Sequence, residues 1–291
     1  MTIRVYFDEA YIPPGASADT LTKSADVAAL VRDRVDLVAP APLTDEEIAR
    51  VHARAYVDAV RTGSPEMLAW SSGVGWTPGL FPAVAASSGG VVAAAVEAFA
   101  SGRNAGSLSS GLHHARREAG GGYCTFNGLA LAADAAERAG ATSILVLDLD
   151  AHCGGGTHEL LADDDAVRVL DIATSDFDHY APEPGWTLDV IARAADYLPT
   201  LRRRLDGLAR ERLALVLYNA GMDPHEDCLT GGLHGMTTEV LAEREEAVFR
   251  WARERGVPVA FVLAGGYRSA RLTRDRLASL HAMTVDAATK W

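Results

Sequence analysis

Strand-length apolar runs alternate with longer helix-like segments along this chain, and this alternation constrains the fold more than any other feature of the sequence. The runs are rich in Val, Ile and Leu, and several are apolar at successive rather than alternate positions. Such runs are typical of strands that are buried on both faces of a parallel sheet. The expected strands are residues 3–7, 143–149, 166–172, 213–220 and 257–264.

The segments between the runs carry helix signals. Thr44 and Glu47 match a capping box at the start of one segment, and Gly256 follows the end of another. The alternation of strand and helix predicts an α/β fold in three layers, with helices on both faces of a central, mostly parallel sheet. No linker, repeat or low-complexity block divides the pattern, so we expect one domain over residues 1–291. The expected helices lie within residues 44–63, 81–102, 127–140, 187–212 and 237–256.

The composition argues against several classes of protein. A net charge of −12 argues against a nucleic-acid partner, because phosphate backbones are bound by concentrated Lys and Arg. The first residues form no cationic and apolar leader, and no run reaches the roughly 18 apolar residues of a membrane span. Cys124, Cys153 and Cys228 form no CxxC pair, which favours free thiols in a reducing compartment. We therefore expect a cytoplasmic protein with no membrane partner.

Ionisable residues follow one apolar run at close spacing, in the stretch LVLDLDAHCGGGTHE at residues 145–159. In an open parallel sheet, ligands bind beyond the carboxyl ends of the strands, and residues i, i+2 and i+4 of an extended segment point the same way. We therefore expect Asp148, Asp150 and His152 to share one side at the mouth of the sheet. A structural alternative is that Asp150 caps the next helix and His152 is an ordinary hydrogen-bonded histidine.

A third candidate metal ligand follows another apolar run. Asp223, in GMDPHED, comes directly after residues 213–220 and should reach the same edge of the sheet. Together with Asp150 and His152 it forms two carboxylates and one imidazole, which suit a divalent ion such as Zn²⁺ and leave a coordination position open for water and substrate. Alternation turns Cys153 to the other side, where packing is its expected role.

Two further motifs supply groups for acid–base chemistry. The stretch GLHHAR places His113 and His114 in a glycine-flanked loop, and histidine titrates close to neutral pH. The stretch VLAGGYRS places Tyr267 after a strand and two glycines, where its hydroxyl can donate to an oxyanion. Each motif occurs by chance elsewhere, but all of them are expected at the carboxyl edge of one sheet.

These motifs, in this order, resemble the zinc-dependent histone deacetylase family, which includes acetylpolyamine amidohydrolases and acetoin-utilisation-type proteins and has the arginase/deacetylase fold. The resemblance implies that Asp150, His152 and Asp223 bind Zn²⁺, that His114 is the general base and then acid, and that Tyr267 polarises the acyl carbonyl. The matching blocks are LTDEEIARVHARAYVDAV, GLHHARREAGGGYCTFNGLALAA, VLDLDAHCGGGTHE, NAGMDPHEDCLTGGLHGMTTE and VLAGGY.

The same resemblance assigns roles to residues around the metal. It implies that Asp148 steadies His113, that Gly122 offers its carbonyl oxygen to the substrate amide, and that Tyr123 lines the tunnel for the acyl-amine chain. It also implies a potassium ion beneath the zinc, held by Asp148 and by main-chain oxygens around Asp150 and His152.

Two positions depart from the family pattern. Gly155 stands where the family usually has Asp or Asn holding the second histidine, so we expect His114 to lack that partner. Trp76 lies about where the family often has a substrate-orienting aspartate. The replacement of that aspartate by tryptophan, together with the acidic surface, favours a small N-acyl metabolite over protein acetyl-lysine as the substrate.

The predicted function is therefore zinc-dependent hydrolysis of an N-acyl amine, with an N-acetyl group expected. A non-catalytic acyl-amine-binding protein is one alternative. A two-manganese ureohydrolase is another, but the positions two after His152 and two after Asp223 are Gly154 and His225, so carboxylates for a second metal are missing. The sequence gives no indication of the oligomeric state.

Overall fold

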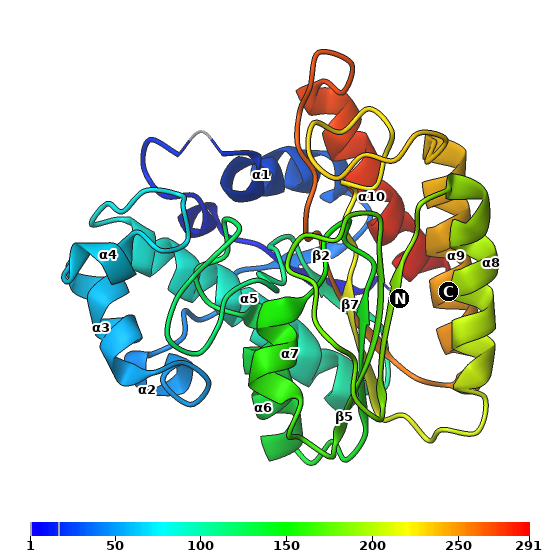
Figure 1. Cartoon of the computed structure of the whole chain (residues 1–291), viewed down its shortest axis with the longest axis horizontal. Coiled ribbons are helices and arrows are strands. Elements are labelled where there is room, and N and C mark those ends of the chain that lie inside the picture. The colour runs from blue at the N-terminus through cyan, green and yellow to red at the C-terminus, as the bar shows by residue number, and fades with distance from the viewer. Residues whose placement is uncertain (1, 17) are drawn as a thin grey trace.

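The computed structural model describes residues 2–16 and 18–291, and a sheet of eight strands forms its centre (Figure 1). The strand order is β2-β1-β3-β8-β7-β4-β5-β6, and every pairing is parallel. The predicted α/β class is thus confirmed. The strands are β1 Arg4–Tyr6, β2 Asp36–Val38, β3 Ala105–Ser107, β4 Ile144–Asp148, β5 Val167–Ala173, β6 Trp186–Val190, β7 Leu215–Asn219 and β8 Val259–Val262.

The helices lie in two layers, one on each face of the sheet. Figure 1 shows α8, α9 and α10 on one side of the strands and α5, α6 and α7 on the other. The described helices are α1 Asp19–Val31, α2 Asp45–Ile48, α3 Arg54–Thr62, α4 Glu66–Ala69, α5 Leu80–Ser101, α6 Gly128–Arg138, α7 Gly155–Leu161, α8 Ala194–Gly207, α9 Thr238–Arg255 and α10 Arg274–Lys290, with a short 3₁₀ turn at Glu9–Tyr11.

Alternate residues of the central strands divide the core between these layers. On β4, Leu145 and Leu147 belong to the cluster formed with α1, α8, α9 and α10, whereas Ile144 and Val146 belong to the cluster formed with α3, α5 and α6. Successive side chains of a strand point to opposite faces, so a strand covered on both faces must be apolar throughout. The continuous apolar runs in the sequence have this cause.

All five expected strands are present, and three others were not expected. Strands β2 and β3 have only three residues each, too few to show a pattern. Strand β6 is an edge strand that begins at Trp186 and overlaps residues 187–212, where a helix was expected; only α8 in that range is helix. Its residues are half-buried or exposed except Trp186, so it lacks the apolar run of a central strand.

The segment 44–63 also differs from the expectation, because it forms two helices rather than one. The capping box is present: Thr44 Oγ1 accepts a hydrogen bond from Glu47 N, and Thr44 N donates to Glu47 Oε2. Helix α2 ends at Ile48, and the chain then turns inward so that His52 is buried. Its Nδ1 donates to the carbonyl of Arg116, and its Nε2 accepts from Asn127 N. These long-range bonds interrupt the helix.

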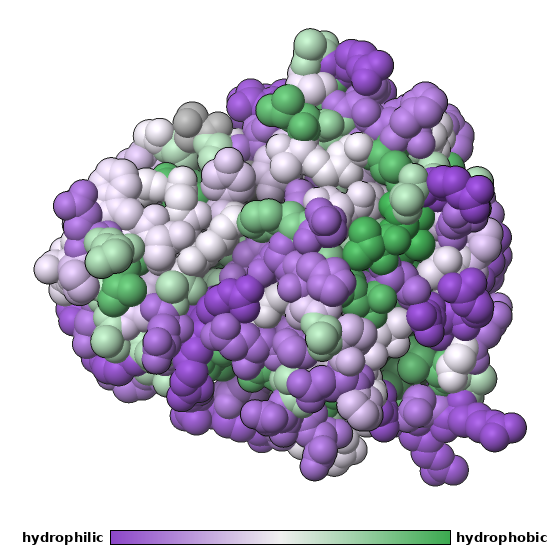
Figure 2. Space-filling model, viewed as in Figure 1, coloured by the Kyte–Doolittle hydropathy of each residue, from purple (hydrophilic) through white to green (hydrophobic). Residues whose placement is uncertain are grey.

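Helix α5 is long and apolar enough to cross a membrane, with a mean hydropathy of 1.6 over its most apolar 18-residue window. However, 61% of that window is buried inside the protein, against α6, β3 and β8. A buried core helix passes the same test, so this feature is weak evidence for a span. Figure 2 shows that hydrophobic residues form separate small groups among larger hydrophilic areas on the face in view.

Candidate metal centre

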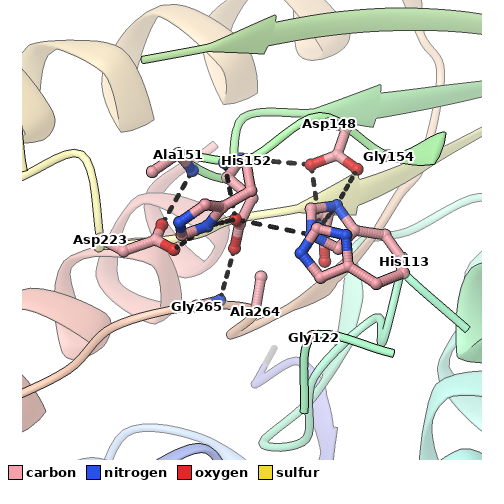
Figure 3. Close-up of polar contacts among 12 residues, drawn as sticks. His113, Gly122, Asp148, Ala151, His152, Gly154, Asp223, Ala264 and Gly265 are labelled. Atoms are coloured by element: carbon pink, nitrogen blue, oxygen red, sulfur yellow. Dashed lines mark hydrogen bonds and ion pairs between the residues drawn. The ribbon is translucent and has the colours of Figure 1, made fainter. Parts of the chain in front are cut away.

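Asp150, His152 and Asp223 meet at the carboxyl ends of β4 and β7. Figure 3 shows His152 beside Asp223. All three are buried, and one ligand atom from each lies within 4.8 Å of the others. Nδ1 of His152 is 3.1 Å from Oδ1 of Asp150 and 3.2 Å from Oδ2 of Asp223. It is the only such group found among the described residues. The predicted ligands therefore converge.

The local geometry differs from the extended segment that was expected. Strand β4 ends at Asp148, so Asp150 and His152 lie in the loop that follows it. That loop is folded by its own carboxylates: Asp150 N donates to Asp148 Oδ1 at 3.2 Å, and His152 N donates to Asp150 Oδ1 at 3.0 Å. Asp150 does not cap α7, because the N-cap residue is Gly154 and no side chain caps it. The structural alternative for Asp150 is therefore wrong.

Neighbouring loops fix the two carboxylates. Asp223 Oδ1 accepts a hydrogen bond of 2.9 Å from Ala151 N, and Asp150 Oδ2 accepts one of 2.7 Å from Gly265 N. A Cβ added at Gly265 would lie 2.1 Å from Asp223 Oδ2 and 2.4 Å from Asp150 Oδ2. A side chain there would fill the space beside the ligand atoms, so glycine is required at this position.

The charges of the group also fit a cation. Oδ2 of Asp223 is buried and lies 3.2 Å from Nδ1 of His152. Burial opposes a charge on His152, but hydrogen bonds to Asp150 and Asp223 outweigh it and raise the pKa of His152 to about 11. The imidazole thus holds a proton between two carboxylates. Because a ligating imidazole must be neutral, a divalent cation would take the place of that proton.

His113 and His114 lie beside the group with their rings 4.0 Å apart between centroids and their Nε2 atoms 3.1 Å apart. Nδ1 of His113 is 2.7 Å from Oδ2 of Asp148, the carboxylate expected to steady it. Burial opposes protonation of His113, but Asp148 and Asp150 outweigh it and raise the pKa of His113 to about 10. Burial and the neighbouring His113 lower the pKa of His114 to about 4. The pair therefore divides into a charged and a neutral histidine.

The expectation that His114 lacks a partner is wrong. Nδ1 of His114 lies 2.9 Å from Oδ2 of Asp178, in the loop between β5 and β6. Gly155 contributes no side chain, as expected, and Asp178 lies over it: a Cβ at Gly155 would be 2.6 Å from Asp178 Oδ1. The sequence analysis missed Asp178 because no spacing pattern links it to His114.

A second residue that the sequence analysis missed is Arg244, on α9. It is fully buried, and its Nη1 donates to the carbonyl oxygens of Leu149 and Gly221. Those carbonyls precede the candidate ligands Asp150 and Asp223 by one and two residues, so one side chain holds both of the loops that carry them. Helix α9 is rich in charged residues, and its sequence contains no signal that this arginine points inward.

Except for Asp148, the predicted catalytic and substrate residues line one narrow cavity of about 20 Å³. This cavity leads into a wider entrance of about 490 Å³, because His114, Gly122, Tyr123 and Tyr267 line both. Gly122 has φ 52°, and a Cβ on it would lie 2.4 Å from Cδ2 of His114, so its backbone packs against that ring. Tyr123 is half exposed, and its ring is 6.2 Å from that of Tyr267.

Trp76 does not line the entrance. Its Nε1 donates to the carbonyl of Val60 at 2.6 Å, and its ring packs so closely on Gly63 that a Cβ there would lie 2.8 Å from it. Ser71, Ser72 and Gly73 line the entrance instead. The residues found to line it include no Asp, Glu, Lys or Arg, and its outer part carries the half-exposed ring of Phe177.

Comparison with known proteins agrees with this geometry. A family model described as "Histone deacetylase domain" matches residues 16–283. The chain belongs to the histone deacetylase family. It is 33% identical to Histone deacetylase 2 of Arabidopsis thaliana over 192 residues, which cover 60% of this chain and 47% of that protein. It is 30% identical to the acetoin utilization protein AcuC of Bacillus subtilis over 151 residues, 48% of this chain and 39% of that one.

Another similar protein aligns over a larger share of its length. An uncharacterized protein of Picosynechococcus is 34% identical over 230 residues, which cover 75% of this chain and 74% of that protein. Among solved structures, the HD domain of HDA15 matches with a TM-score of 0.82 and 19% identity, over 100% of this chain and 90% of that one. At that identity the match shows the fold alone, and the fold is the one that the sequence predicted.

Proposed function

We propose that this histone deacetylase family member is a zinc-dependent hydrolase of N-acyl amines, with an N-acetyl group as the expected acyl part. The observation that carries the proposal is the convergence of Asp150, His152 and Asp223, because Asp150 lines the same cavity as His113, His114 and Tyr267. A candidate metal ligand, a pair of histidines and a hydroxyl donor then reach the same small space.

The ligand set suits zinc. Two carboxylates and one imidazole are borderline-hard donors, and three protein ligands leave a coordination position open. When bound, Zn²⁺ supplies a Lewis acid for the acyl carbonyl and lowers the pKa of water toward about 7.

The protein's own residues supply proton transfer and orientation. Nδ1 of His114 lies against Asp178, which leaves Nε2, 3.1 Å from Nε2 of His113, as the nitrogen that takes a proton from water and returns it to the departing amine. The Tyr267 hydroxyl is the group that donates to the carbonyl oxygen as negative charge develops there. The carbonyl of Gly122 accepts the substrate amide N–H, Tyr123 lines the path of the acyl-amine chain, and Asp148 steadies His113.

We infer that a small N-acyl amine is a better substrate than protein acetyl-lysine. The residues found to line the entrance carry no carboxylate that could bind a peptide backbone, and the chain has a net charge of −12. Buried free cysteines support a reducing, cytoplasmic location, and we propose a single catalytic domain over residues 1–291. No nucleic-acid or membrane partner is proposed.

We also propose a potassium ion beneath the zinc, held by Asp148 and main-chain oxygens around Asp150 and His152. Asp171 supports this proposal, because it pairs in register with Asp148 and is fully buried with no hydrogen bond to its Oδ1 from the described residues. Burial and the neighbouring Asp148 raise the pKa of Asp171, and a cation would relieve that repulsion. Thermal stability should then rise with potassium more than with sodium.

The test combines metal analysis with a substrate panel. Purified protein is assayed for zinc and for hydrolysis of acetyl-lysine peptides, acetylpolyamines and N-acetyl amino acids. Asp223→Ala is assayed beside it, with the exposed Asp163→Ala as the matched control. One zinc per chain and hydrolysis of small amides, both lost only in Asp223→Ala, support the proposal.

Other outcomes would overturn it. Bound zinc with no hydrolysis of any substrate would indicate the acyl-amine-binding protein. Two manganese ions per chain with urea release would indicate the ureohydrolase. A preference for peptides would keep the chemistry but overturn the proposed substrate class.

A further inference from the structure

We propose that Asp178 is the positioning residue that fixes the orientation and tautomer of His114. Asp178 lies in a loop that is distant from His114 in the sequence, and it occupies the space that a side chain at position 155 would fill. This inference rests on the proposed hydrolysis for its consequence in catalysis. The hydrogen bond itself can be tested whether or not the protein is active.

The carboxylate of Asp178 is aimed at His114 by an unusual backbone conformation. Asp178 has φ 62°, in the left-handed region that Asp and Asn enter more readily than most residues. Its side chain is only 12% exposed, and its Oδ2 lies 2.9 Å from Nδ1 of His114. The preceding Phe177 places its ring edge-on to His114, with centroids 5.1 Å apart and planes at 89°. One turn therefore contacts the imidazole in two ways.

Gly155 and Asp178 fit each other. A Cβ at Gly155 would lie 2.5 Å from the carbonyl oxygen of Asp178 and 2.6 Å from its Oδ1. No side chain at that position is compatible with the loop as it stands. A carboxylate on α7 and a carboxylate on the 174–180 loop are thus mutually exclusive, and this chain has the second.

The other carboxylate oxygen of Asp178 is held by Arg116. Nη2 of Arg116 donates to Asp178 Oδ1, and its Nη1 donates to the carbonyl of Gly155 and to Glu159 Oε2, each at 3.1 Å. Arg116 carries only donors. It therefore fixes which oxygen faces it and leaves Oδ2 for His114.

This arrangement selects one tautomer of His114. A carboxylate accepts but cannot donate, so Nδ1 of His114 must carry the proton. In the neutral ring Nε2 then keeps its lone pair, and Nε2 faces His113 at 3.1 Å beside the cavity that both rings line. A general base needs that lone pair, because the opposite tautomer presents an N–H to the reacting water.

The same reasoning predicts that asparagine at this position is as harmful as alanine. In Asp178→Asn, Arg116 keeps the amide oxygen, so the NH₂ group faces Nδ1 of His114 and favours the wrong tautomer. Replacing Arg116 as well, in Arg116→Met with Asp178→Asn, lets the amide turn and present its oxygen. The double variant should then be more active than Asp178→Asn alone.

The experiment measures kinetics and imidazole protons on the zinc-loaded protein. For Asp178→Ala and Asp178→Asn, kcat should fall by about 10²–10⁴-fold, the usual contribution of a general acid–base group, with KM nearly unchanged. Asp176→Ala, an exposed carboxylate in the same loop, is the matched control. Zinc content and melting temperature are recorded to separate this role from folding.

Proton NMR supplies a readout that does not need activity. Imidazole N–H groups bonded to buried carboxylates resonate far downfield, and the structure predicts one signal each for His113 with Asp148 and His114 with Asp178. Asp178→Ala should remove the second signal and leave the first. Gly155→Ala should weaken it too, because the added Cβ displaces Asp178.

The outcomes separate the two proposals. If the wild type is inactive on every substrate but Asp178→Ala removes one downfield signal, the hydrolase function fails and the His114–Asp178 bond stands. If the wild type is active and Asp178→Ala keeps full kcat or both signals, Asp178 is not the positioning residue. An Asp178→Asn variant that matches the wild type would overturn the tautomer argument.

Discussion

Nη1 of Arg244 lies 2.7 Å from the carbonyl oxygen of Gly221, two residues before the candidate metal ligand Asp223. The same nitrogen donates at 3.1 Å to Leu149, next to Asp150, and the guanidinium pairs with Glu245. A fully buried arginine on α9 thereby connects the two loops that carry the candidate metal ligands. Stability and metal binding should therefore depend on the same side chain.

We predict that Arg244→Met lowers the free energy of unfolding by about 3–5 kcal/mol, because it leaves Glu245 as an unpaired buried charge. The affinity for zinc should fall as well, since both ligand loops lose a fixed carbonyl. Urea denaturation and zinc titration measure the two effects, with the exposed Arg250→Met as control. A variant as stable as the wild type would contradict the structural role.

Tyr267→Phe tests the proposed oxyanion donor. Loss of one such donor typically lowers kcat by about 10²–10³-fold. Tyr267 is not among the candidate metal ligands, so zinc content and melting temperature should stay at wild-type values. Steady-state kinetics on the substrate of the panel that the wild type hydrolyses fastest measure this change in kcat. Unchanged turnover would remove Tyr267 from the mechanism.

Zinc affinity should increase with pH. In the metal-free protein the pKa of His152 is about 11, so its imidazole carries a proton at neutral pH that zinc must displace. Displacement of one proton raises the apparent affinity roughly tenfold per pH unit below that pKa. Competition with a chelator at pH 7 and pH 9 measures the slope. An affinity independent of pH would show that His152 is already neutral.

His52 should make stability depend on pH. Burial lowers its pKa from 6.5 to about 4, although a hydrogen bond to the carbonyl of Arg116 opposes this. Between pH 6.5 and pH 4, His52 is protonated in the unfolded chain but neutral in the folded protein. The free energy of unfolding therefore falls as the pH drops below 6.5, and the loss is complete near pH 4. The total penalty is roughly 3 kcal/mol.

Comparison of His52→Gln with the wild type isolates this effect from other titrating groups. Glutamine can offer one donor and one acceptor but has no proton to gain in this range. Urea denaturation at pH 5 and pH 7 should show a loss of stability that is about 2 kcal/mol smaller in the variant than in the wild type. Equal losses would mean that His52 is not the titrating group.

The central strands and the set of candidate metal ligands could be predicted from the order of residues along the chain. Strands β4 and β7 are apolar up to their last residues, Asp148 and Asn219, because helices cover both faces, and that burial is visible residue by residue in the sequence. Asp150, His152 and Asp223 follow directly after such strands, and parallel strands bring their carboxyl ends to one edge. Local order along the chain was therefore enough to place these three residues together.

The groups that hold the site in position could be found only from the packing of the folded chain. Asp178 is 64 residues from His114, and Arg244 is 95 residues from Leu149. Trp76 likewise turned inward to Val60 instead of reaching the entrance. Nothing in the spacing of these residues encodes such contacts, because they depend on how loops and helices from separate parts of the chain pack over the sheet. Periodicity and motif order describe neighbours along the chain, whereas the partner of a buried polar group is whichever group packing brings within hydrogen-bond distance.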